Sequence, residues 1–313
     1  MDMSEILLKD LNEMAKGNPT EMIRRAEESY HSKIGEIAAR VVNSEDIRIV
    51  LIAGPSGSGK TTSANMLADA IRDRGEDVLV ISLDDFYRNT DDPNYPRLAS
   101  GERDFETVEA LDIPTLNETL ADIAAGREFL VPKYDFKKSK RTEMREYASM
   151  AHGCVIIEGL HALNPAVFSP LPKEKVLKIF ISVSTNVNDG TERVISGRKM
   201  RFIRRMIRDS IYRATGAERT LEIWENVLHG EDKYLYPNRI YADVSFDTFH
   251  LFELSVTRRF VEKLISDELA QKNEYAKAVL TASRAAYPID VSLVPESSLI
   301  REFIPGGKYE ALY

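Results

Sequence analysis

IRIVLIAGPSGSGKT, residues 47–61, opens with a short β-branched run and closes with a glycine-rich loop. The apolar run 47–53 predicts a buried strand, and the residues from Lys60 to about Arg74 predict a helix. Between them, residues 54–61 match G-x-x-x-x-G-K-[ST] without a mismatch. Glycines let backbone N–H groups converge on an anion, and the start of the helix adds the positive end of its dipole. The stretch therefore predicts a strand, a phosphate-binding loop and a helix in succession.

The loop predicts a binding site for ATP with Mg²⁺. Lys60 supplies a mobile cation for the β- and γ-phosphates and counts as a catalytic group, while Thr61 offers its hydroxyl to the metal. A glycine-rich turn that binds nothing is the alternative, and the flanking strand and helix disfavour it. A guanine-specific N-K-x-D segment is absent, which disfavours a GTPase switch. The predicted ATP-binding residues of the loop are Gly54, Pro55, Ser56, Gly57, Ser58, Gly59, Lys60, Thr61 and Thr62.

Charge and composition limit the classes of partner. The 313 residues include 42 Lys and Arg against 50 Asp and Glu, a net charge of -8 at pH 7. This balance disfavours a large nucleic-acid or anionic-membrane surface. No apolar run approaches the roughly 18 residues that span a bilayer, and the Met1 end lacks a signal-like segment. We expect a cytoplasmic protein with a small-molecule substrate, no nucleic acid and no membrane, and homo-oligomerisation is left open. The single cysteine, Cys154, is predicted to be a buried small hydrophobe.

Four more apolar runs follow the style of the first, at residues 78–83, 153–157, 176–183 and 241–246. Helical patterns separate them at 113–125, 189–214, 218–229 and 249–268. Continuous apolar strands that alternate with helices predict an α/β fold, with a parallel sheet covered by helices on both faces.

Three segments are predicted along the chain. Residues 1–45 form an N-terminal helical appendage, residues 46–268 form the domain that carries the phosphate loop, and residues 269–313 form a C-terminal helix and a tail that packs on this domain. Residues 88–103, rich in Asp, Pro, Asn and Gly, predict a long loop over the sheet.

Two acidic sites follow predicted strands. Asp84 and Asp85 come after the strand at 78–83, where ligands of open α/β sheets collect. A carboxylate there can accept a proton from a substrate hydroxyl and face a metal ion, so we predict Asp84 to be catalytic. Glu158 ends the strand at 153–157 and predicts a second Mg²⁺ ligand beside Thr61. A solvated turn at Asp84 and an acidic loop residue at Glu158 are the alternatives.

A basic helix is predicted at residues 198–208, RKMRFIRRMIR. Four of its arginines fall at i, i+3, i+4 and i+7 and share one face, at Arg201, Arg204, Arg205 and Arg208. Guanidinium groups on one face repel each other unless they meet anions, and phosphoryl transfer needs such a clamp. A solvated basic face, neutralised by nearby acids, is the alternative.

These features together resemble the uridine kinase branch of the phosphoribulokinase/uridine kinase family. The resemblance spans about residues 47–268 and rests on segments in the family's order. They are GPSGSGKTT, ISLDDFYR (81–88), RDFETVEALD (103–112), VPKYDF (131–136), IIEGLHALNP (156–165), RFIRRMIRD (201–209) and YADVSF (241–246).

The resemblance implies a Rossmann-like parallel sheet, a substrate-covering hairpin and an arginine-bearing lid. It implies that Asp84 is the catalytic aspartate and that it also contacts the substrate. Arg204 is implied to be catalytic, Arg201 to contact ATP, and Arg208 to contact the substrate. The other implied substrate contacts are Tyr87, Glu106, Tyr134 and Phe136. Related enzymes carry Asp at the position of Glu106, and animal-type members carry a His at the position of Ser139.

We therefore predict an ATP-dependent kinase that phosphorylates a hydroxyl group, with the 5′-hydroxyl of uridine or cytidine as the first candidate. A kinase for another polyol or hydroxy-acid is the alternative within enzymes, because Ser139 replaces a base-reading group. A catalytically silent ATP-binding regulatory module is the alternative outside enzymes.

Overall fold

Five parallel strands form the central sheet of the computed structural model, which describes residues 5–98, 100–136, 138–150 and 153–312. The order across the sheet is β10-β7-β2-β6-β3, so the strand that leads into the phosphate loop lies at the centre. The strands are β2 (Ile49–Ala53), β3 (Val78–Ser82), β6 (Cys154–Glu158), β7 (Val176–Ser182) and β10 (Val244–Asp247). All five strands match the predicted runs, and the predicted α/β class is confirmed.

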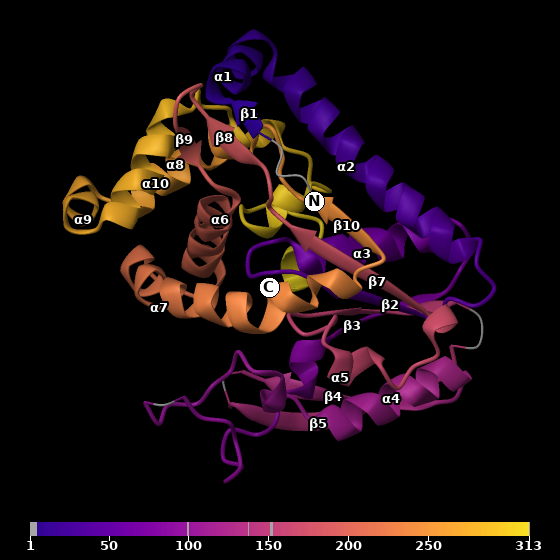
Figure 1. Ribbon diagram of the computed structural model, residues 1–313. Helices are drawn as coiled ribbons and strands as arrows, with labels where there is room; N and C mark the ends of the chain where they lie inside the picture. Colours follow the sequence, from indigo (N-terminus) through magenta and orange to yellow (C-terminus); the bar gives the residue numbers. More distant parts are fainter. Residues whose placement is uncertain (1–4, 99, 137, 151–152, 313) are drawn as a thin grey trace.

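Side chains of β2 alternate between two hydrophobic cores, as the period of a strand requires. Val50 and Ile52 pack in the core that contains α2 (Pro19–Val42) and α3 (Lys60–Arg72). Ile49 and Leu51 pack in the core that contains α4 (Ile113–Ala125). Figure 1 shows α2 and α3 on one side of the sheet and α4 on the other. The continuous apolar run at 47–53 therefore reflects burial on both faces.

The helix predicted at 189–214 begins later than the sequence suggested. Its first residues include a short strand, β9 (Arg193–Ile195), which pairs with β8 (Asn186–Asn188) just before the predicted helix, and β8 also pairs with β1 (Glu5–Leu7). The helix itself, α6, spans Gly197–Tyr212, and the Ser196 side chain caps it by accepting from the N–H of Lys199. The remaining helices of the domain are α5 (Pro165–Phe168), α7 (Ala217–Gly230) and α8 (Glu253–Leu264).

An antiparallel hairpin, β4 (Phe129–Asp135) with β5 (Lys140–Tyr147), lies beside α4 below the sheet (Figure 1). It contains the predicted aromatic segment VPKYDF. Ser139 sits at its turn in a left-handed conformation with φ of 53°, and its carbonyl accepts from the N–H and the hydroxyl of Thr90. The turn thus anchors the long loop that follows β3.

Both ends of the chain pack on the domain that carries the phosphate loop. The N-terminal segment consists of β1, α1 (Leu8–Gly17) and α2, and the C-terminal segment holds two helices, α9 (Asp267–Lys272) and α10 (Glu274–Ala285), where a single helix was predicted. Residues of α2, α3 and α10 belong to the same hydrophobic core. The predicted boundaries at 45 and 268 stay predictions, and the outermost residues 1–4 and 313 lie outside the described residues. Among the described helices, none is long and apolar enough to cross a membrane.

Candidate active site

The phosphate loop leaves β2 at the centre of the sheet and enters α3 at Lys60. Two of its glycines have left-handed backbone conformations, Gly57 with φ of 72° and Gly59 with φ of 88°. A Cβ at Gly57 would lie 2.7 Å from the carbonyl oxygen of Arg201, so the loop also approaches α6 closely. The Nζ of Lys60 donates to the carbonyl of Pro55 at 3.3 Å. The predicted succession of strand, glycine-rich loop and helix is thus present, and phosphate binding by the loop stays a prediction.

Arg201 holds the outer side of the loop. Its side chain is fully buried, and it donates to the carbonyl of Ser56 at 2.9 Å. Both of its terminal nitrogens donate to the Glu231 carboxylate at 2.8 Å. The same carboxylate accepts from the N–H of Ser56 at 2.8 Å. Arg201 and Glu231 therefore fix both backbone groups of one loop residue.

Arg204 has a similar role about one turn further along α6. It is fully buried, pairs with Glu253 at 2.7 Å, and donates to the carbonyl of Gly57 at 3.2 Å. It also donates to the hydroxyl of Thr248, which in turn donates to the carbonyl of Ser58 at 2.8 Å. These contacts leave Arg204 behind the loop. Neither Arg201 nor Arg204 lines the cavity in front of the loop. The predicted contact of Arg201 with ATP and the predicted catalytic role of Arg204 stay predictions.

A polar cavity of about 230 Å³ opens in front of the loop. It gathers residues of the phosphate loop, acids at or just after the ends of β3 and β6, and arginines of α6 and of the residue that follows it. Its polar and aromatic lining residues are Ser56, Lys60, Thr61, Asp84, Tyr87, Glu106, Glu158, Arg205, Arg208, Arg213, Glu231 and Glu302. Most of the predicted site residues therefore meet in one place. They are joined by Arg205, which was on the predicted basic face without an assigned contact, and by three further charged residues, Arg213, Glu231 and Glu302.

Thr61 and Glu158 lie side by side at one end of the cavity. The Thr61 hydroxyl donates to the Glu158 carboxylate at 3.3 Å. Burial raises the pKa of Glu158 to about 7, the positive charge of Lys60 opposes this shift, and the charge of Asp84 adds to it. A hydroxyl and a carboxylate beside a phosphate-binding loop fit Mg²⁺, which takes few protein ligands and keeps waters. Among the described residues, no three His, Cys, Asp or Glu side chains converge on a metal site.

The two adjacent acids after β3 separate into different roles. Asp85 accepts from the N–H of Tyr134 at 3.2 Å and pairs with Arg145, so it ties the hairpin to the sheet. Asp84 instead faces the open cavity. Surrounding protein displaces water from Asp84 and raises its pKa, while the charge of Lys60 opposes that rise. Of the two acids, only Asp84 is placed to act on a bound substrate.

Three arginines line the cavity. Arg205 and Arg208 come from α6, and Arg213 follows its last residue. The Asp209 carboxylate pairs with all three, at 3.2 to 3.3 Å. Arg205 also donates to the hydroxyl of Ser56 at 2.8 Å, which brings one guanidinium to the loop itself. This cluster can neutralise phosphate charge.

The three predicted aromatic residues, Tyr87, Tyr134 and Phe136, pack against one another. The ring centroids of Tyr87 and Tyr134 are 5.7 Å apart, and those of Tyr134 and Phe136 are 5.0 Å apart. Only Tyr87 of the three lines the cavity, and Phe136 is 62% exposed. The hydroxyl of Ser139 donates to the carbonyl of Phe136 at 3.4 Å inside the hairpin turn. The aromatic cluster therefore borders the cavity through Tyr87.

Glu106 reaches the cavity from the long loop. Its side chain lies so close to Gly230 that a Cβ there would be 2.8 Å from the Cβ of Glu106. Desolvation raises the pKa of Glu106 to about 7, and the charge of Arg205 opposes this rise. The N–H of Glu106 donates to the Asp104 carboxylate at 3.0 Å. The residue is held in place and can accept hydrogen bonds.

The cavity residues without a predicted contact differ in whether a sequence pattern indicated them. Arg205 was on the predicted basic face and could have been chosen from the same periodicity. Arg213 follows that helix closely. Glu231 and Glu302 had no local signal, because they reach the cavity only when a turn after α7 and the C-terminal tail pack against it.

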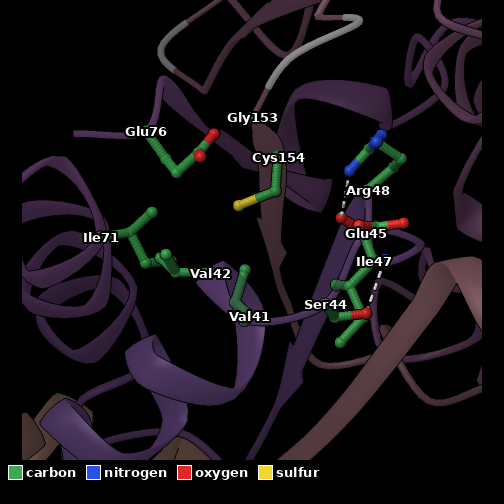
Figure 2. Close-up of a pocket in the computed structure, with 10 residues that line it drawn as sticks. All are labelled: Val41, Val42, Ser44, Glu45, Ile47, Arg48, Ile71, Glu76, Gly153 and Cys154. Atoms are coloured by element: carbon green, nitrogen blue, oxygen red, sulfur yellow. Dashed lines mark hydrogen bonds between the residues drawn. The ribbon is translucent and has the colours of Figure 1, made fainter. Parts of the chain in front are cut away.

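A second cavity lies at the opposite end of the sheet, where β2 and β6 begin (Figure 2). Figure 2 shows the Cys154 side chain among Val41, Val42 and Ile71, with Glu76 and Arg48 nearby. Cys154 is buried, as predicted, and burial raises the pKa of its thiol to about 12. A neutral buried thiol is a poor nucleophile, and this cavity brings together none of the predicted site residues.

Comparisons with known proteins point to one family. The model of the phosphoribulokinase/uridine kinase family matches residues 49–254, more than half of the chain. A uridine kinase of Lactobacillus johnsonii is 27% identical over 63% of this chain and 84% of its own length. A uridine kinase of Deinococcus deserti is 28% identical over 63% of this chain and 85% of its own length. The solved structure of a possible uridine kinase from Bacillus stearothermophilus matches 69% of this chain and 98% of its own, with 18% identity and a TM-score of 0.45.

Proposed function

Because the chain belongs to the phosphoribulokinase/uridine kinase family, we propose that it transfers the γ-phosphoryl group of ATP to the 5′-hydroxyl of uridine or cytidine. Membership makes the chain a phosphotransferase that acts on an alcohol group. The acceptor and the residue roles are our proposal. The observation that carries it is one cavity that holds Lys60, Asp84 and Glu106 together.

The donor side of the cavity suits the phosphates of ATP. N–H groups at the start of α3 have no partners within the helix, so they can bind phosphate oxygens. Lys60 donates to a loop carbonyl and can swing from it to the β- and γ-phosphates. Thr61 and Glu158 would hold Mg²⁺, which would supply positive charge to offset that of the phosphates. Arg205, Arg208 and Arg213 would meet the charge on the transferring oxygens.

Asp84 is the proposed general base. Of the two acids that follow β3, it is the one that lines the cavity, and its raised pKa brings it closer to the pH at which a base works best. It would accept the proton of the acceptor hydroxyl while that oxygen attacks the γ-phosphorus. Desolvation raises the pKa of Asp84, and the positive charge of Lys60 opposes that rise.

Glu106 and Tyr87 would hold the acceptor. A carboxylate can accept two hydrogen bonds from the vicinal hydroxyls of ribose, and Tyr87 with its aromatic neighbours offers a flat apolar surface for a base. Ser139 is engaged within the hairpin turn, so base recognition would rest on stacking. We therefore expect strong selection for ribose and weaker selection among bases.

The test compares uridine, cytidine, 2′-deoxyuridine, inosine and simple polyols under identical ATP and Mg²⁺. Removal of the 2′-hydroxyl leaves a partly buried carboxylate short of a donor, so kcat/KM should fall roughly tenfold to a hundredfold. Equal rates for uridine and 2′-deoxyuridine would remove Glu106 from acceptor binding. A polyol or hydroxy-acid that outruns every nucleoside would identify a different alcohol kinase. ATP binding without transfer to any acceptor would indicate the regulatory module.

Asp84→Asn tests the chemistry directly. The amide keeps the shape but cannot accept the proton, so kcat should fall by at least about a hundredfold while ATP binding persists. Asp122→Asn is the matched control, since Asp122 lies on α4 and pairs with Arg127 away from the cavity. Unchanged turnover in the Asp84 variant would contradict its role as base.

A further inference from the structure

The C-terminal segment at residues 299–304 reaches the active site, although it lies beyond the residues that match the family. It contains the 3₁₀ turn η7 (Leu299–Glu302), and four of its apolar side chains are fully buried, at Leu299, Ile300, Phe303 and Ile304. In Figure 1 this segment belongs to the yellow end of the chain near α3 and α6. The buried side chains fix this segment in place, so its polar residue Glu302 has a defined position at the cavity.

One contact of this segment is with the phosphate loop itself. A Cβ on Gly59 would lie 2.7 Å from the Leu299 side chain, so Leu299 packs directly against the loop. Phe303 lies against the buried Arg204, whose guanidinium carbon is 5.1 Å from the ring centroid. The segment thus supports the loop from the side that faces away from the cavity.

Glu302 carries the segment into the cavity. Its side chain is 4% exposed and lines the cavity wall. One carboxylate oxygen accepts from the Thr62 hydroxyl at 2.8 Å, and the other lies 3.6 Å from Nη1 of Arg208. Thr62 stands in the first turn of α3, directly after Thr61. Glu302 therefore joins the helix that follows the phosphate loop to an arginine of α6 that lines the cavity.

We propose that Glu302 is a positioning residue that holds Arg208 toward the transferring phosphoryl group. This inference rests on the kinase function proposed above. Among the described residues, Arg208 otherwise pairs only with its neighbour Asp209, at 3.2 Å, which also pairs with Arg205 and Arg213. A guanidinium that is placed before ATP arrives needs no reorganisation during transfer, which is the condition for effective charge stabilisation.

This role accounts for an acid in a cavity that suits phosphate. A free carboxylate there would repel ATP, but the pair with Arg208 and the bond from Thr62 compensate its charge. Glutamine at this position can still accept from Thr62 while it loses the charge pair. The substitution Glu302→Gln therefore removes the ion pair with Arg208 and leaves the packing of the segment unchanged.

The experiment measures kcat with acceptor, slow ATP hydrolysis without acceptor, ATP affinity by calorimetry, and thermal unfolding. For Glu302→Gln we expect both rates to fall about tenfold, with ATP affinity and the unfolding temperature near the wild-type values. The matched control is Glu310→Gln, because Glu310 lies on the same tail and accepts from Tyr212 of α6 at 3.2 Å, outside the cavity. Its rates should equal those of the wild type.

A double variant decides whether Glu302 acts through Arg208. If it does, Glu302→Gln should add little to the loss already caused by Arg208→Ala, since residues that act as a unit are not additive. Unchanged rates in Glu302→Gln, or a full additional loss in the double variant, would overturn the inference. A wild-type protein that binds ATP but neither hydrolyses it nor phosphorylates any acceptor would instead overturn the proposed function.

Discussion

Arg204 and Arg205 are neighbours in the sequence, yet they face opposite environments. Arg204 is fully buried and pairs with Glu253 behind the phosphate loop, whereas Arg205 lines the cavity and contacts the hydroxyl of Ser56. One residue step turns a helix by about 100°, so a dense run of arginines must divide between two surfaces. The basic helix therefore both supports the loop and lines the site.

The two groups differ in what neutralises them. Arg201 and Arg204 each have a buried glutamate partner and donate to loop carbonyls. Arg205 and Arg208 share Asp209 and keep a side toward the cavity. Loss of a supporting arginine should therefore be felt first in stability, and loss of a cavity arginine first in turnover.

Arg204→Ala should produce the largest effect. It leaves Glu253 buried without its partner and frees the Gly57 carbonyl, so the free energy of unfolding should drop by about 3–5 kcal/mol. Urea denaturation followed by circular dichroism measures the change. Replacing both Arg204 and Glu253 by Met should recover much of the loss. A stable Arg204→Ala protein with normal turnover would contradict the inference that Arg204 supports the phosphate loop.

Arg208→Ala should lower kcat by roughly a hundredfold to a thousandfold, the range for loss of one donor that stabilises developing charge. The unfolding free energy should change little, because the side chain borders the open cavity. Steady-state kinetics at saturating ATP and acceptor gives kcat, and urea denaturation gives stability. A change confined to KM for ATP would make this wall a binding surface only.

Two acids with different partners, Glu253 beside Arg204 and Glu158 beside Thr61, predict a smaller effect that depends on pH. Glu253 keeps its arginine, whereas Glu158 has a pKa raised to about 7 by burial. A carboxyl that is protonated below about pH 7 is a poor metal ligand, so Mg²⁺ should bind better as the pH rises through 7. The Mg²⁺ concentration for half-maximal turnover should be roughly tenfold higher at pH 6 than at pH 8. Glu158→Gln controls for the titration of ATP itself and should lose this difference.

Arg198→Ala should give the smallest effect. Arg198 lies on the same helix but pairs with Asp232 in solvent, with 45% and 49% of the side chains exposed. Exposed pairs contribute roughly 0–1 kcal/mol, so neither stability nor turnover should change by more than that. A large loss of stability or of turnover would contradict the inference that an exposed arginine of this helix contributes little to either.

Sequence patterns predicted the sheet and the loop because both depend on local chemistry. Five apolar runs became five parallel strands, and the glycines of the loop adopt the left-handed backbone that only a few residues tolerate. The helix predicted at 189–214 failed at its start, where β9 completes a small sheet with β8, and β8 pairs with the N-terminal strand β1. That pairing joins residues far apart in the chain, and no local periodicity reports it.

The sequence by itself determined that this chain carries a phosphate loop at residues 54–61, a strand-end acid at Asp84 and a basic helix after residue 196. Only the tertiary structure decided which of two adjacent acids faces the cavity and which arginines of one face lie behind the loop. It also decided that Glu231 and Glu302 join the site. The reason is physical, because residue type sets what a group can do, but its exposure and its partners depend on segments that meet only in the folded chain.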